Sequence, residues 1–362
     1  MGYSTRIFGL DLLRAFAILT VVYGHGNILL EHEFDKAKMN WFTFDGVSIF
    51  FVLSGFLIGG ILIKQIETGR TQWSDLFRFW RRRWFRTLPN YFLVLTVLTC
   101  YYVWVTNRPF SELLPYFGFL QNFAWDHPIH FNEAWSLSVE EWFYLGVPLL
   151  MWSSFHLFAL TPRHTLILVA LIILTISGTV RIWRFLDGDI DSVHAWDLSL
   201  RKQVVTRLDS IMIGVIAAYI KFYRLNSWFA NQKKKLFAGI GLIIAHKVFI
   251  ASMLAEEVVS AYDAIFSFWV IALGTALTLP YLSNWKVSRS TWSAAITKIS
   301  LISYSMYLIH LSGVLRILVQ DFGIADFSTA LGYLAYWFFT FTISWLMYRF
   351  YEKPTTALRE KF

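Results

Sequence analysis

Residues 9–30 read GLDLLRAFAILTVVYGHGNILL, an apolar segment long enough to cross a membrane that nevertheless contains Arg14 and His25. Ionisable side chains at membrane depth are energetically costly, and by default they mark a functional site. In an α-helix, eleven residues make roughly three turns, so both side chains face the same way and stand roughly 16 Å apart along the axis. The segment therefore predicts a membrane helix with an arginine towards one surface and a histidine towards the other.

The rest of the chain is also apolar. Of its 362 residues, 56% are hydrophobic and 15% are charged, whereas a soluble domain carries about 25% charged residues. We therefore expect an all-α integral membrane protein, with residues 1–362 forming a single membrane-embedded domain. Apolar runs of about 20 residues predict a bundle of about ten transmembrane helices, near 9–30, 44–63, 88–106, 134–159, 165–182, 208–223, 236–254, 263–282, 296–319 and 329–350.

Charged residues alternate between the two sides of this bundle. Loops 64–87 and 221–235 are rich in lysine and arginine, whereas the acidic residues gather around 31–35, 187–197 and 256–263. By the positive-inside rule, the basic loops and both termini are cytoplasmic. The rule also accounts for the net charge of +8, and no nucleic-acid-binding motif occurs, so no nucleic-acid partner is expected.

Two stretches on the outer side, 107–133 and 183–207, are the least hydrophobic parts of the chain. They contain His127, His130 and His194 together with several tryptophans and acids. Such stretches are either passive connectors or the wall of an external site for a polar substrate. Composition alone leaves both interpretations open.

An arginine cluster follows the second predicted span, in RFWRRRWFRTLPNYF at 78–92. Guanidinium groups bind phosphates through paired hydrogen bonds, so a donor with several phosphates, such as coenzyme A, suits this cluster. The alternative is that the charges orient the chain and contact anionic membrane lipids. The donor-binding residues predicted on this side are Arg81, Arg82, Arg83 and Arg86, together with Ser54 of the second span.

Small residues give the second span, DGVSIFFVLSGFLIGGIL at 45–62, a narrow face. Ser54-Gly55 and Gly59-Gly60 suit tight packing beside a channel, or helix packing alone.

Two adjacent carboxylates, Glu140 and Glu141, lie in NEAWSLSVEEWFYL at 132–145, a turn or more inside the outer end of their helix. This is a depth comparable to that of His25. Consecutive helical residues point about 100° apart, so we expect at most one of them to face His25. A carboxylate beside an imidazole fixes its tautomer and suits it to general-base work. For the other glutamate, structural hydrogen bonding is expected.

Further polar residues are candidates for binding an acceptor substrate. Some come from RLDSIMIGV at 207–215, at the outer mouth of the sixth span, and others from ISYSMYLIHL at 302–311. Taken one by one, these residues could equally well be structural pairs that hydrogen-bond to each other inside the protein. A carboxylate at a helix start is an ordinary helix cap. The candidates are Asp45, Trp135, Arg207, Asp209, Tyr304 and His310. No metal-binding motif, P-loop or nucleotide fingerprint occurs, so no metal is expected.

Taken together and in order, these segments resemble the membrane-bound acyltransferase family 3, bacterial integral-membrane O-acyltransferases of surface carbohydrates. The resemblance covers most of the chain, and the arginine–ten–histidine spacing of the first span is its defining feature. It implies an acyl-CoA donor, usually acetyl-CoA, on the cytoplasmic side of the bacterial inner membrane. The acceptor would be a hydroxyl of a carbohydrate or lipid-linked glycan at the outer face.

The resemblance also implies roles for individual residues. His25 matches the essential histidine and Arg14 its partner, Arg83 and Arg86 match paired arginines, and Glu140 and Glu141 match a glutamate pair. Some relatives carry a C-terminal SGNH-type domain outside the membrane. This sequence ends at Phe362, soon after the last span, so we expect no such domain. Transfer would then be direct or be completed by a separate protein, and a homo-oligomer is compatible with either route.

The resulting hypothesis is that arginines of 81–86 hold the coenzyme A phosphates while His25, oriented by Glu140 or Glu141, deprotonates the acceptor hydroxyl or takes the acyl group itself. The alternative class is a transporter or flippase for a lipid-linked sugar or other polar metabolite, because intramembrane charges suit that function too. A sensor or scaffold without turnover is a third class.

Overall fold

The computed structural model describes residues 6–359 except 32, 107–108 and 287–289, and within this part every regular element is a helix. The longer helices are α1 (Phe8–Gly26), α3 (Gly46–Glu67), α4 (Trp73–Thr106), α6 (Ala134–Leu157), α7 (Pro162–Leu186), α9 (Val204–Tyr223), α11 (Gln232–Glu256), α12 (Ser267–Leu282), α13 (Thr291–Ile309), η5 (His310–Asp321) and α15 (Thr329–Met347). Short elements join them: η1 (Asn27–Leu29), α2 (Lys36–Asn40), η2 (Phe110–Leu113), α5 (Leu114–Phe117), α8 (Val193–Trp196), η3 (Asp197–Arg201), α10 (Leu225–Phe229), η4 (Tyr262–Phe266), α14 (Ile324–Phe327), η6 (Tyr348–Glu352) and α16 (Lys353–Leu358).

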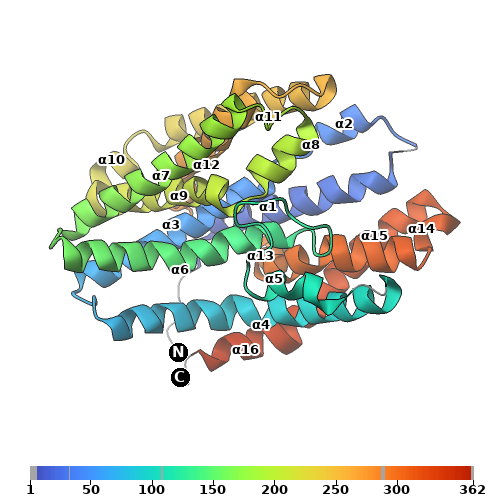
Figure 1. Ribbon diagram of the computed structural model, residues 1–362, viewed down its shortest axis with the longest axis horizontal. Helices are drawn as coiled ribbons and strands as arrows, with labels where there is room; N and C mark the ends of the chain where they lie inside the picture. Colours follow the sequence, from blue (N-terminus) through green and yellow to red (C-terminus); the bar gives the residue numbers. More distant parts are fainter. Residues whose placement is uncertain (1–5, 32, 107–108, 287–289, 360–362) are drawn as a thin grey trace.

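The long helices run side by side along the longest axis of the molecule (Figure 1). Among the described residues, eight helices are long and apolar enough to cross a membrane. A ninth span forms if the pair 193–201 and 204–223, bent by 64°, is counted as one. The fourth predicted span, 134–159, corresponds to α6, which has 24 residues but is not among those eight or nine. The prediction of an all-α membrane bundle is confirmed.

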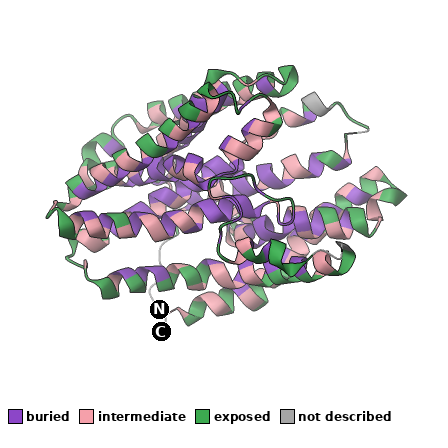
Figure 2. Ribbon diagram, viewed as in Figure 1, coloured by how far each residue is buried: buried purple, intermediate pink, exposed green. Residues whose placement is uncertain are grey.

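The surface of the bundle is apolar, as a lipid environment requires. Large hydrophobic side chains point outwards from several helices, such as Phe237, which is 69% exposed, Leu334 and Phe338. Figure 2 shows that buried residues concentrate where the helices meet in the middle of the bundle. A soluble monomer rarely exposes so extensive an apolar surface, so the exterior supports the membrane assignment.

Helices α3 and α9 pack closely through small residues, as the narrow face of the second span predicts. A Cβ atom on Gly55 would collide with the backbone oxygen of Ile211, and one on Gly214 would collide with that of Val52. Gly60 faces open space. Backbone contact along this seam therefore depends on Gly55 and Gly214, whereas Gly60 lies outside it.

The segment before α6 folds into the protein. Gln121 Nε2 donates a hydrogen bond of 2.5 Å to Ser138 Oγ, and Asn122 Nδ2 donates one of 3.0 Å to the backbone oxygen of Trp135. Glu133, also buried, accepts hydrogen bonds from the backbone nitrogen and hydroxyl of Ser312. Because protein groups surround this end, α6 begins inside the bundle.

Candidate active site

A first cavity, named here the Arg14 cavity, lies among α1, α3, α4, α6 and α13. It has an empty volume of about 930 Å³ with its mouth included. The polar residues of its lining come from six elements that are distant in sequence. They are Arg14, Ser54, Arg83, Arg86, Thr87, Ser136, Glu140, Tyr144, Ser300, Ser303, Tyr304, Tyr307 and Glu352.

Three arginines meet in this cavity. Arg14 Nη1 lies 3.3 Å from Asp11 Oδ1 and donates to Ser300 Oγ at 3.2 Å, so α1 and α13 fix its position. The Arg83 guanidinium lies over the Tyr144 ring, 4.7 Å from its centre. Three cations around one cavity suit an anion with several phosphates.

Arg81 and Arg82, predicted alongside Arg83 and Arg86 as donor ligands, are exposed on α4 and do not line the cavity. The reason is helical periodicity. Residues 83, 86 and 87 share the face of α4 that meets the bundle, whereas 81 and 82 point away from it.

The glutamate pair splits between two environments, as the 100° separation predicts. Glu140 lines the Arg14 cavity and accepts a hydrogen bond of 3.0 Å from the Tyr144 hydroxyl, which is itself 2.5 Å from Ser54 Oγ. Glu141 is buried and accepts a 2.7 Å hydrogen bond from Thr87 Oγ1. Neither hydrogen-bonds to His25, so the expectation that one of them orients it is wrong. The reason is that Glu140, the seventh residue of α6, bonds to Tyr144 of its own helix, while Glu141 bonds to Thr87 of α4.

A second cavity, named here the His25 cavity, lies among α1, α3, α8, η3, α11 and α12. Its empty volume is about 1610 Å³ with the mouth included. Asp45 lines it and also caps α3, accepting hydrogen bonds from the Ser48 backbone nitrogen at 3.0 Å and hydroxyl at 2.5 Å. The other polar lining residues are Thr20, His25, Asn40, Thr43, His194, Asp197, Arg201, His246 and Lys247. Both cations and carboxylates therefore face this space.

The hydrogen-bond partner of His25 is another histidine. His25 Nδ1 lies 2.8 Å from His310 Nε2, and the two ring planes are inclined by 27° with centres 5.0 Å apart. His310 Nδ1 lies 2.9 Å from the backbone oxygen of Tyr307 and 3.1 Å from that of Met306. His310 is fully buried and lines neither cavity. Its predicted role as a substrate ligand therefore has no support from the lining of either cavity.

Two more of the predicted acceptor ligands lie elsewhere. Tyr304 lines the Arg14 cavity, where its hydroxyl donates to the Thr87 backbone oxygen at 2.8 Å. Trp135 is buried behind the wall of the His25 cavity, with the Arg201 guanidinium 5.3 Å from its ring centre. Neither touches the His25 cavity. Of the six predicted acceptor residues, Asp45 is the one that lines it.

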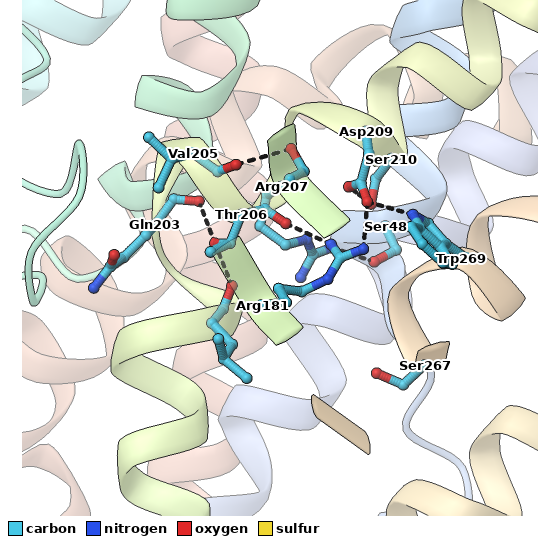
Figure 3. A network of polar contacts seen from close by, with 12 residues as sticks. Ser48, Arg181, Gln203, Val205, Thr206, Arg207, Asp209, Ser210, Ser267 and Trp269 are labelled. Atoms are coloured by element: carbon cyan, nitrogen blue, oxygen red, sulfur yellow. Dashed lines mark hydrogen bonds and ion pairs between the residues drawn. The ribbon is translucent and has the colours of Figure 1, made fainter. Parts of the chain in front are cut away.

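Arg207 and Asp209 belong to a buried polar network (Figure 3) rather than to the outer mouth of a span. Arg181, also fully buried, forms an ion pair of 2.6 Å with Asp209, which accepts a second hydrogen bond from Trp269 Nε1 at 2.5 Å. Arg207 donates to Ser48 Oγ at 2.6 Å. The predicted location of this pair at an outer mouth is wrong, because both side chains are fully buried and line neither cavity.

Several residues of the His25 cavity carry no motif in the sequence. Composition does not decide whether the stretch 183–207 is a connector or a site wall, and in the structure its residues 193–201 form part of the wall. Arg201 and Lys202 both pair with Asp197, at 2.5 Å and 2.7 Å. His246 and Lys247 of α11 were not singled out. Ionisable residues within the predicted span 236–254 were the signal that could have found them.

Val47 is the residue common to both linings within the described part of the chain, so the two cavities approach each other at this side chain. Helix α1 reaches both of them, with Arg14 in one and His25 in the other. The predicted separation of this cation and this imidazole along the helix agrees with the two linings, and their depths in a membrane stay a prediction. The arrangement can hold an anionic group in the Arg14 cavity while an imidazole serves a polar molecule in the His25 cavity.

Sequence comparisons agree with this arrangement. O-acetyltransferase OatA of Staphylococcus aureus strain NCTC 8325 is 32% identical over 238 residues, which is 60% of this chain and 35% of that protein. Peptidoglycan O-acetyltransferase OatA of Listeria monocytogenes is 32% identical over 171 residues, 43% of this chain and 25% of that protein. A putative O-acetyltransferase of Staphylococcus aureus strain COL is 26% identical over 327 residues, 83% of this chain and 50% of that protein.

The chain thus spans between a quarter and a half of the length of these relatives. No solved structure matches it. The profile of a family described as an acyltransferase domain matches residues 7–349, which is nearly the whole chain. With its helical membrane bundle and its Arg14–His25 helix, the chain belongs to the membrane-bound acyltransferase family 3.

Proposed function

We propose that this protein transfers an acyl group, in the first place acetyl, from coenzyme A to a hydroxyl of an extracytoplasmic carbohydrate. The observation that carries the proposal is that α1 places Arg14 in one cavity and His25 in another, and that Val47 lines both cavities. The proposed setting is the bacterial inner membrane, with the Arg14 cavity open to the cytoplasm. The names of the relatives, O-acetyltransferases that include a peptidoglycan O-acetyltransferase, support the choice of donor group and acceptor class.

On the donor side, Arg14, Arg83 and Arg86 would hold the phosphates of coenzyme A. Arg83 is anchored over Tyr144 and Arg14 is anchored to Asp11 and Ser300. Cations that are already fixed lose little side-chain entropy on binding, which favours affinity for a multiply charged ligand. The acyl thioester would extend from this cavity past Val47 towards His25.

On the acceptor side, His25 would remove the proton of the acceptor hydroxyl as its oxygen attacks the thioester carbonyl carbon. The carbon–sulfur bond breaks, the acyl–oxygen ester forms, and the leaving thiolate takes the proton back from His25. The products are the acylated carbohydrate and free coenzyme A. General-base catalysis of this kind contributes about 10²–10⁴-fold to a rate.

The experiment that tests the proposal uses purified protein in lipid vesicles, with acetyl-CoA radiolabelled in the acetyl group and a soluble glycan acceptor. The wild type should move label from coenzyme A to the glycan. A transporter or flippase would leave the label on coenzyme A, and that outcome would overturn the proposal.

His25→Ala should reduce label transfer by at least about 100-fold at equal protein abundance, because it removes the proposed base. His164→Gln provides a matched histidine control, since His164 is exposed at the start of α7 and lies outside both cavities. Full transfer by His25→Ala would reject the assigned chemistry even if the wild type is active.

A further inference from the structure

The contacts of His310 specify where its proton lies. Its Nδ1 faces two backbone oxygens, those of Tyr307 and Met306, at 2.9 Å and 3.1 Å. Carbonyl oxygens only accept hydrogen bonds, so Nδ1 must carry the hydrogen that is donated to them. In the neutral ring, the other nitrogen, Nε2, is then an acceptor.

The position of the proton on His310 determines the position of the proton on His25. The His310 Nε2 acceptor lies 2.8 Å from His25 Nδ1, so His25 Nδ1 must be the donor in that contact. A neutral imidazole with its hydrogen on Nδ1 has a bare lone pair on Nε2. Among the described residues, no hydrogen bond to His25 Nε2 occurs, and His25 lines the cavity. The ring therefore presents its basic nitrogen to that space.

We propose that His310 is a positioning residue that holds His25 in the Nδ1–H tautomer and so reserves Nε2 as the base that receives the acceptor proton. The inference rests on the proposed function, because it assigns a second histidine to the same reaction. His310 does not touch the substrate, since it is fully buried and lines neither cavity.

The surroundings make His310 a rigid anchor. It is the first residue of η5, a π-helix, and follows directly after α13. A change from α to π hydrogen bonding shifts the register of the backbone carbonyls and recurs at functional sites. The Tyr307 hydroxyl, one turn earlier, contacts Ser136 Oγ at 2.7 Å and donates to the Glu133 backbone oxygen at 3.2 Å. These contacts hold Tyr307, whose backbone oxygen accepts the hydrogen bond from His310 Nδ1, against α6.

Two substitutions separate tautomer control from simple packing. His310→Gln keeps a side-chain oxygen that can accept from His25 Nδ1, whereas His310→Leu fills similar space without an acceptor. We expect kcat to fall about 10- to 100-fold in His310→Leu, a part of the general-base contribution, with little change in the KM for either substrate. His310→Gln should recover most of that loss. Equal loss of kcat in both variants, with both folded, would overturn the proposal.

A spectroscopic measurement tests the tautomer without turnover. The chain has nine histidines, so ¹⁵N-histidine labelling, with His25→Asn to assign the signal, identifies the His25 ring nitrogens by NMR. The wild type should show a protonated Nδ1 and a bare Nε2, and His310→Leu should show a mixture of tautomers. A protonated Nε2 in the neutral wild-type ring would overturn the proposal.

These outcomes are distinguishable from failure of the proposed function. The NMR result concerns the hydrogen bond alone and stands whether or not the protein acylates a glycan. A His25→Ala variant with full label transfer would reject the function, while an unexpected tautomer in an active enzyme would reject only the role of His310.

Discussion

Replacing Asp209 with asparagine should destabilise the protein strongly without changing its affinity for donor or acceptor. Asp209 is fully buried and is the ion-pair partner of the equally buried Arg181 at 2.6 Å. Its carboxylate also accepts from Trp269 Nε1 at 2.5 Å. The amide would keep the volume of the side chain but leave the guanidinium without its counter-charge.

The magnitude follows from this burial. Breaking a buried ion pair by neutralising one partner costs about 3–5 kcal/mol, because the remaining charge stays desolvated. The Arg181 hydrogen bond to the Thr206 backbone oxygen at 2.6 Å survives, so the lower part of that range is expected. Replacing both partners with apolar residues, in Arg181→Met with Asp209→Leu, should recover most of the loss, since it removes both charges.

Chemical unfolding of the purified protein in detergent, followed by tryptophan fluorescence, measures these differences. Asp189→Asn is the control, because Asp189 is exposed after α7 and its change should leave the free energy of unfolding within about 0.5 kcal/mol of wild type. The reasoning would be refuted if Asp209→Asn were as stable as wild type and had instead lost acceptor binding.

Three further predictions concern other parts of the molecule. Gly55→Ala should lower the free energy of unfolding by about 1–3 kcal/mol through overpacking at the α3–α9 seam. Gly60→Ala, whose new methyl group meets open space, should raise the free energy of unfolding by about 0.5–1 kcal/mol. Thermal unfolding of both variants checks the contrast. Arg83→Ala should weaken equilibrium binding of acetyl-CoA about tenfold or more, as expected for loss of a charge-assisted hydrogen bond of about 1.5–3 kcal/mol. Arg78→Ala, an exposed change on the same helix, should leave the affinity unchanged. If Arg83→Ala bound acetyl-CoA as tightly as wild type, Arg83 would be excluded from the donor site. Burial lowers the pKa of the His127 imidazole from 6.5 to about 3. Between these two pH values the unfolded chain binds a proton that the folded protein does not, so the free energy of unfolding should fall as the pH drops from 6.5 towards 3. In a His127→Phe variant, the free energy of unfolding should depend less steeply on pH across that range.

Sequence periodicity predicted the features of this protein that depend on a single helix. The common face of Arg14 and His25, the divergence of Glu140 from Glu141 and the close packing at Gly55 all follow from 3.6 residues per turn. These predictions agree with the contacts of the structure.

Predictions that depended on the relation between helices were less successful. The expected pairing of Glu140 with His25 was wrong, because Glu140 lines the Arg14 cavity and accepts a hydrogen bond from Tyr144. The pairing of His25 with His310 joins residues 285 positions apart, and no local pattern encodes it. The sequence predicts Arg207 at the outer mouth of the sixth span, but the chain bends by 64° before α9 and the side chain lies inside the bundle.

The position of Val47 in the walls of both cavities has a consequence for the membrane itself. If the cavities open on opposite faces, as proposed, a continuous file of water between them would leak protons and ions and dissipate the voltage across the bilayer. A hydrophobic constriction blocks ions because water does not wet it. The apolar valine side chain would then keep ions and water from crossing between the cavities. A thioester arm can push the side chain aside, whereas a hydrated ion cannot.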